Sequence, residues 1–163
     1  MPRPHIAAAD RARPRPVTCP LSNFCAYHND FSSSGTPVLY AIQPYLDASR
    51  GGCTNAANAN APGPNGDSDA DNVLTAVSHE LFETVTDPRP NTSIGWCDGT
   101  YNAGVPFFGP SCVNGQIGGE IGDKCNQMFP KPRNSDGSDI IINGHPYILQ
   151  QEYSNRQSRC SMS

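Results

Sequence analysis

Only one stretch of this sequence, residues 71 to 86, has the periodicity of an amphipathic helix. Its apolar residues recur at steps of three and four positions and form one stripe, which consists of Val73, Leu74, Val77, Leu81 and Val85. We expect this stripe to face the core. Asp87-Pro88 ends the helix, because the residue before a proline is disfavoured in the helical region. A chain with a single helix has to complete its fold with strands and loops.

Two regions are predicted to form strands. Residues 38–42 alternate in a strand pattern, with one face made of Val38, Tyr40 and Ile42. Residues 139–142 and 146–150 are apolar runs on either side of Asn143-Gly144. Asn-Gly between apolar runs strongly indicates a hairpin, because both residues tolerate positive φ.

Long loops are expected over residues 49–68 and 88–119, since the chain has 15 Gly and 16 Pro among its 163 residues. Loops of this length are usually functional or held by a disulfide. The sequence therefore predicts an α+β fold: a small mixed sheet packed on the helix at about 71–86, with long disulfide-pinned loops. We expect the Pro- and Arg-rich residues 1–20 to be a disordered arm and residues 24–163 to form a single domain.

The seven cysteines indicate an oxidising compartment, because they do not form the paired Cys-x-x-Cys pattern of a zinc ribbon. A sequon at Asn91 agrees with secretion. The first residues lack the apolar region of a signal peptide, so we expect a mature or truncated form. A net charge of −4 disfavours nucleic-acid binding. No apolar run is long enough to predict a membrane span.

The helix carries His79-Glu80-Leu81-Phe82-Glu83, which places an imidazole and a carboxylate one turn apart on the same face. This spacing matches the zinc-binding helix His-Glu-x-x-His, with Glu83 as an oxygen ligand in place of the second histidine. Glu80 would be the general base for a metal-activated water. The alternative is a surface helix with solvated carboxylates and a hydrogen-bonded histidine.

A catalytic zinc site needs a third protein ligand, and the segment 118–125 offers Glu120 and Asp123 among glycines that allow close approach of the backbone. One carboxylate could bind the metal while the other orients His79. The spacing leaves open which does which. The alternative is an acidic loop pinned by a disulfide at Cys125.

Other candidates carry less weight. The acidic run 67–71 resembles the start of a calcium loop, but it lacks the required glycine, and Ser78 stands where the final glutamate belongs. We expect this run to cap the helix instead. A structural role is favoured for His28 and His145, of which His28 is the better candidate for a cleft. A Cys-His hydrolase is disfavoured, because no thiol is placed beside a base.

Several motifs occur together in one order: Asn65-Gly66-Asp67, His79-Glu80-Leu81-Phe82-Glu83 with Thr86-Asp87-Pro88, Glu120-Ile121-Gly122-Asp123-Lys124-Cys125, Tyr147-Ile148-Leu149-Gln150-Gln151-Glu152-Tyr153 and Cys160-Ser161-Met162-Ser163. In these motifs the chain resembles the phosphate-induced protein (Exordium-like) family. The similarity is strong from about residue 65 to the end and fainter over residues 24–47.

The resemblance implies a secreted protein, in plants one linked to growth and apoplastic signalling. The helix and the following loop are similar to the gluzincin layout of zinc metallopeptidases, which would make His79 and Glu83 ligands, Glu80 the base, and Glu120 or Asp123 the third ligand. Typical members are about twice as long, so we expect the N-terminal half to be absent here. That absence would expose apolar surface or remove one wall of the cleft.

The family usually has an aromatic residue after Trp96, where this chain has Cys97. The resemblance suggests three disulfides: Cys97–Cys112, Cys125–Cys160 and Cys25–Cys53. We expect a secreted, zinc-dependent hydrolase-like domain that cleaves peptide bonds, with a peptide or cell-wall-associated substrate. The alternative is a non-catalytic extracellular signalling or cell-wall-associated protein that retains a structural metal or none.

Overall fold

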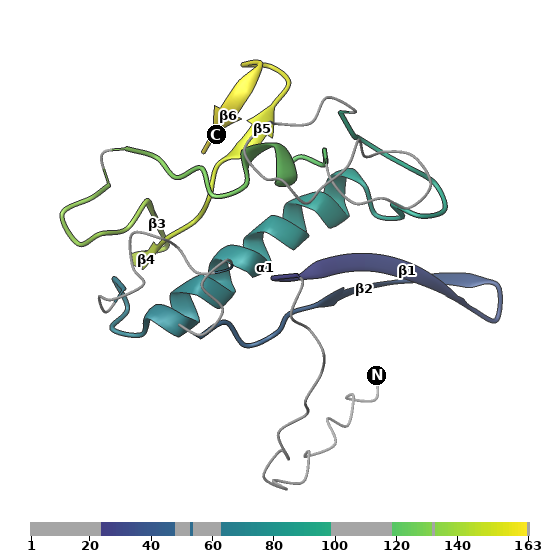
Figure 1. Ribbon diagram of the computed structural model, residues 1–163, viewed down its shortest axis with the longest axis horizontal. Coiled ribbons are helices and arrows are strands. Elements are labelled where there is room, and N and C mark those ends of the chain that lie inside the picture. The colour runs from purple at the N-terminus through teal and green to yellow at the C-terminus, as the bar shows by residue number, and fades with distance from the viewer. Residues whose placement is uncertain (1–23, 48–52, 54–62, 99–118, 132, 163) are drawn as a thin grey trace, which may run out of the picture.

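The computed structural model describes residues 24–47, 53, 63–98, 119–131 and 133–162. Within these ranges one long helix lies between a hairpin on one side and the C-terminal segments on the other (Figure 1). The elements in chain order are β1 (Tyr27–Ser33), β2 (Thr36–Ile42), α1 (Ser68–Thr86), the short 3-10 helix η1 (Asp123–Cys125), β3 (Ile140–Ile142), β4 (His145–Tyr147), β5 (Glu152–Ser154) and β6 (Arg159–Ser161). This arrangement confirms the predicted α+β class.

Helix α1 begins at Ser68, slightly earlier than predicted, because Asp67 caps it. The Asp67 carboxylate accepts hydrogen bonds from two backbone N–H groups of the first turn, each at 3.1 Å. The capping interpretation of the acidic run 67–71 is therefore confirmed. The helix ends at Thr86, immediately before Asp87-Pro88, as the sequence predicts.

The strands form three separate two-stranded antiparallel sheets in the described part of the chain, rather than one mixed sheet. The predicted hairpin at Asn143-Gly144 is confirmed, with φ values of 52° and 82° at the turn. The predicted strand over 38–42 is β2, and its partner β1 was not among the predicted strands. The turn between β1 and β2 is Ser34-Gly35, which also has positive φ at both residues.

Two of the three expected disulfides are present, Cys25–Cys53 and Cys125–Cys160. The second ties η1 to β6 and so holds the segment around η1 in place. Cys97 is disulfide-bonded as well, but its expected partner Cys112 lies outside the described residues. Most of the predicted loops and the expected arm at residues 1–20 also lie outside them. No helix in the described ranges is long and apolar enough to span a membrane.

The prediction that the apolar stripe of α1 faces the core is wrong. Leu81 and Val85 are 60 % and 72 % exposed, and Leu74 and Val77 are also exposed. Helix α1 instead buries polar residues, namely Asp71, Asn72, Thr75, Glu80 and Glu83. The reason is that its neighbours offer polar partners: the Thr75 hydroxyl, for example, donates to the backbone carbonyl of Ile148 at 2.6 Å. The helix is therefore rotated to satisfy these groups.

Candidate metal centre

The second half of α1 brings His79 and Glu83 together, as their spacing predicts. The His79 Nε2 atom lies 3.0 Å from Glu83 Oε1 across one helical turn. The Glu83 side chain is 2 % exposed, whereas that of His79 is 15 % exposed. A charged carboxylate this deeply buried needs a partner of opposite charge or several hydrogen bonds.

The segment 119–125 packs directly against this pair. The backbone N–H of Asp123 donates to Glu83 Oε1 at 3.1 Å, and Asp123 Oδ1 lies 3.6 Å from His79 Nε2. Gly122 permits the approach, because a Cβ atom there would lie 2.7 Å from His79 Nδ1 and 3.0 Å from Glu83 Oε1. The expected close approach of a glycine backbone is therefore observed at this position.

Glu120 takes a different position from Asp123. Its Oε1 atom lies 3.4 Å from His28 Nε2, and its side chain is 3 % exposed. Both Glu120 carboxylate oxygens are buried without a hydrogen-bond partner in the described structure. Of the two carboxylates that the sequence left open, Asp123 is thus the one grouped with His79 and Glu83.

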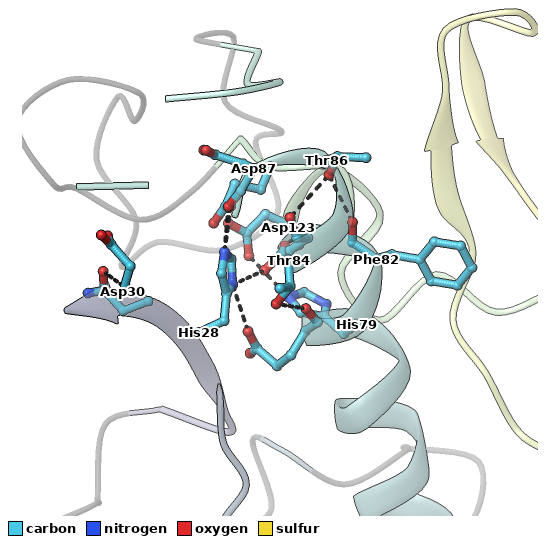
Figure 2. Close-up of polar contacts among 12 residues, drawn as sticks. His28, Asp30, His79, Phe82, Thr84, Thr86, Asp87 and Asp123 are labelled. Carbon is cyan, nitrogen blue, oxygen red and sulfur yellow. Dashed lines mark hydrogen bonds and ion pairs between the residues drawn. The ribbon is translucent and has the colours of Figure 1, made fainter. Parts of the chain in front are cut away.

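His28 enters the site from β1, which lies against α1 (Figure 2). Its Nε2 atom donates a hydrogen bond to the backbone carbonyl of Asp87 at 2.9 Å, and its Nδ1 atom lies 3.1 Å from Glu80 Oε2. Sequence reasoning favoured a structural role for His28 and did not place it in the site. No spacing rule could have found it, because 52 residues separate it from Glu80.

The other ring nitrogen of His79 is held by Gln150, not by an acidic residue. The Gln150 side-chain amide lies 2.9 Å from His79 Nδ1 and donates to the backbone carbonyl of Gly122, also at 2.9 Å. Gln150, rather than a carboxylate of the segment 118–125, therefore holds Nδ1 of His79, while Asp123 lies beside Nε2. Glu120 is directed to His28, and the amide of Gln150 does the orienting.

Burial and mutual repulsion make these carboxylates hard to ionise. Burial, together with the neighbouring charge of Glu83, raises the pKa of Glu120 to about 9. Burial likewise raises the pKa of Glu152, near His79, to about 8. Burial also raises the pKa of Glu83, although His79 opposes the shift. A bound cation would relieve this repulsion.

The pKa values of the two histidines are raised, although burial by itself would lower them. Burial lowers the pKa of His28, but its hydrogen bond to Glu80 and the charges of Glu120 and Glu83 outweigh that effect and raise it to about 9. Burial also opposes a charge on His79, yet Glu83 and Asp123 raise its pKa well above the ordinary value. Both imidazoles therefore sit in a field that attracts positive charge.

Two groups of side chains could hold a metal ion in the described part of the chain. In each group the ligand atoms lie within 4.8 Å of one another, and the groups are His79, Glu83 and Asp123, and His28, Glu80 and Glu83. Each offers one nitrogen and two carboxylates, a donor set that suits zinc and other transition metals rather than calcium. The buried, unpartnered oxygens of Glu120 and Asp123 fit a site built around a cation.

His145 lies at an exposed position on β4 and belongs to neither group. Comparisons of the chain with protein families, with curated proteins and with solved structures gave no match. The metal-binding arrangement therefore rests on the geometry of these side chains alone.

Proposed function

We propose that this chain is a secreted zinc-dependent hydrolase domain that cleaves peptide bonds. The observation that carries the proposal is the convergence of His79, Glu83 and Asp123 at the second half of α1. Three protein ligands with a further position left for water are typical of catalytic rather than structural zinc sites. Glu80 follows His79 directly, as the general base does in zinc-peptidase helices.

His79, Glu83 and Asp123 would hold the metal, and neighbouring groups fix their directions. The Gln150 amide restrains the His79 ring, which leaves Nε2 directed at the two carboxylates. The backbone N–H of Asp123 restrains Glu83. When bound, a zinc ion supplies a Lewis acid that polarises a peptide carbonyl and lowers the pKa of water toward neutrality.

Glu80 would take the proton from the attacking water and pass it to the leaving amine. Its carboxylate is largely buried, and His28 Nδ1 lies 3.1 Å from its Oε2 atom. His28 is held in turn by the backbone carbonyl of Asp87. This chain of contacts restrains the general base, and a restrained base loses less entropy in the transition state.

The resemblance to the Exordium-like family and the disulfides support an extracellular location. Disulfides persist in oxidising compartments, and the two described bonds are compatible with secretion. A peptide or cell-wall-associated substrate would reach the metal from the side of His79 and Asp123. These are the partly exposed ligands, with side chains 15 % and 16 % exposed.

One observation favours a second candidate, an extracellular binding or signalling protein with a structural metal. Glu80, Glu83 and Glu120 are only 4 %, 2 % and 3 % exposed. A centre this enclosed gives a substrate little access. In that case the metal would hold β1, α1 and the segment 119–125 together without turning over a peptide.

The two candidates are separated by comparing the wild-type chain with Glu80→Gln, an isosteric change. The chain is purified without chelator, and its metal content and its cleavage of a mixed peptide library are measured. A hydrolase predicts bound zinc in both proteins and cleavage by the wild type alone. Bound zinc with no cleavage in either supports the structural candidate, and absence of any bound metal contradicts both.

Asp69→Asn provides the matched control for Glu80→Gln. It makes the same carboxylate-to-amide change on the same helix, where Asp69 accepts a hydrogen bond from the Tyr45 hydroxyl far from the cluster. Asp69→Asn should keep both the metal and the activity of the wild type. Equal loss of activity in both variants would point to a general effect on α1 rather than to a general base.

A further inference from the structure

We infer that the chain has a second divalent-cation site, formed by His28, Glu80 and Glu83, which shares Glu83 with the first. The inference rests on the proposed function, because it assumes that His79, Glu83 and Asp123 hold the first ion. It adds to that function a second metal subsite. Glu80 would be a ligand in this subsite and could then no longer act as the general base. The three ligand atoms lie within 4.8 Å of one another and are all buried.

The hydrogen bonds of His28 are those of a metal-binding histidine. Such a histidine usually donates its other ring N–H to a carbonyl or carboxylate, which fixes the ring and its tautomer. The Nε2 atom of His28 donates to the Asp87 carbonyl at 2.9 Å. Its Nδ1 atom is left facing Glu80 Oε2 at 3.1 Å and Glu83 Oε2 at 3.7 Å. In the neutral ring Nδ1 has only a lone pair, so either a proton on Nδ1 or a bound cation supplies the positive charge among these three atoms.

Glu83 is placed to bridge the two subsites. Its Oε1 atom lies 3.0 Å from His79 Nε2, while its Oε2 atom lies 3.7 Å from His28 Nδ1. The two oxygens of one carboxylate thus face different histidines. In two-metal sites the ions are typically about 3.5–4 Å apart, a spacing that one bridging carboxylate can span.

The cluster has room in charge for more than one ion. Four carboxylates, those of Glu80, Glu83, Glu120 and Asp123, surround the two histidines, and bound cations would replace the protons that neutralise them in the metal-free chain. A single cation leaves the remaining carboxylates in a buried region, which is unfavourable unless protons are taken up. Glu120 adds a further buried carboxylate next to the subsite: its Oε1 atom lies 3.4 Å from His28 Nε2, and both its oxygens are buried without a hydrogen-bond partner.

Filling the second subsite changes the role of Glu80 from proton acceptor to ligand. A carboxylate that coordinates a cation is a weaker base, because the cation stabilises its charged form. Cleavage should therefore rise as the first zinc ion binds and fall as the second binds. The second ion should bind more weakly, because it shares Glu83 and is repelled by the first.

The test is a titration of the metal-free full chain with zinc chloride by calorimetry, together with the measured zinc content at saturation. Two equivalents are expected for the wild type, the second weaker than the first. His28→Ala and Glu80→Gln should each bind one equivalent, and His145→Ala, the exposed control, should bind two. In the wild type, cleavage should decline over the range in which the second equivalent binds.

Each of the other outcomes contradicts either the second subsite or the proposed function. One equivalent in the wild type, retained in His28→Ala and lost in His79→Ala, removes the second subsite and leaves the proposed function standing. It would mean that a proton on His28, not a cation, neutralises Glu80. Two equivalents that persist in both variants place the second ion elsewhere and overturn the inference. No binding in the wild type overturns the proposed function itself.

A measurement on the wild type guards against variants that fail to fold. The metal-free chain is loaded with Mn²⁺ and examined by electron paramagnetic resonance. Two ions bridged by Glu83 should give a spin-coupled spectrum at two equivalents. Two equivalents with the spectrum of isolated ions would contradict a shared ligand.

Discussion

The two faces of helix α1 are reversed with respect to an ordinary amphipathic helix. The buried face carries three carboxylates, one amide and one hydroxyl, and the exposed face carries Leu81, Phe82 and Val85. In Figure 2, Phe82 extends away from His28 and His79 on the opposite side of the helix. Burial of apolar area therefore did not set the rotation of α1.

Paired polar contacts set it instead. Each buried polar group on α1 that lies in the site has a partner on another element: Glu80 has His28 on β1, and Glu83 has the backbone of Asp123 on η1. A buried polar group costs stability unless it is paired, so rotating the helix would leave several groups unsatisfied at once. The buried face should therefore be sensitive to substitution and to metal, and the exposed face should tolerate change.

The largest effect is expected for Glu83→Ala in the zinc-loaded protein. The change removes a buried partner of both histidines, and breaking a buried ion pair typically costs ~3–5 kcal/mol. Urea denaturation of the loaded protein measures the loss. In the metal-free protein the loss should be smaller, because the variant also removes repulsion with Glu80 and Asp123. An equal loss in both states would mean that Glu83 acts without a metal.

Removal of the metal should have the second-largest effect on stability. An ion that binds only the folded chain stabilises it by ~4 kcal/mol when present at a thousand times its dissociation constant. Addition of a chelator should therefore lower the midpoint of thermal unfolding, and added zinc should restore it. His79→Ala should show a much smaller response to chelator. An unchanged midpoint in the wild type would mean that no bound metal stabilises the folded chain.

The stability of the metal-free chain should fall as the pH rises. Glu120 has a folded pKa of about 9 against an ordinary value of 4.5, and His28 has one of about 9 against 6.5. In both cases the folded chain holds more protons than the unfolded chain between the two values. Stability is therefore lost on going from about pH 4.5 toward pH 9.

Denaturant midpoints measured along this pH series test the sign. Glu120→Gln should flatten the fall, since the amide does not titrate. The zinc-loaded protein should behave differently, because metal binding replaces the protons and improves as the ligands deprotonate. A rise in the stability of the metal-free chain over the same range would show that the carboxylates are ionised and paired in some other way.

The smallest effect is expected on the exposed face. Leu81→Ser removes a side chain that is 60 % exposed, and surface changes of this kind usually alter stability by no more than about 0.5 kcal/mol. Ile148→Ala is the contrasting control, because Ile148 is 2 % exposed and such core truncations cost ~2–5 kcal/mol. Denaturant unfolding measures both. A large loss for Leu81→Ser would mean that this face is covered in solution.

Local signals in the sequence predicted local structure well. Asn143-Gly144 predicted a hairpin because its backbone preference does not depend on the rest of the chain, and Asp87-Pro88 predicted the end of α1 for the same reason. The disulfides Cys25–Cys53 and Cys125–Cys160 were expected from a family resemblance. Neighbouring residues alone could not indicate them, since the partners lie 28 and 35 residues apart.

The candidate site was predicted only in part. The spacing of His79 and Glu83 determined that both lie on one face, because helical geometry fixes which residues meet across a turn. The sequence did not separate Asp123 from Glu120, and it did not identify Gln150 or His28. Those choices depend on how η1, the segment 148–150 and β1 pack against α1.

The sequence by itself determined the helix, its C-terminal end, the Asn143-Gly144 turn and the presence of a histidine–carboxylate pair, because each follows from interactions between residues near one another in the chain. Only the tertiary structure decided which face of α1 is buried. The buried face depends on several elements at once. The apolar stripe favours one rotation of α1 about its axis, and the polar partners on β1, η1 and Gln150 favour the other. No property of residues 68–86 taken alone weighs these against each other.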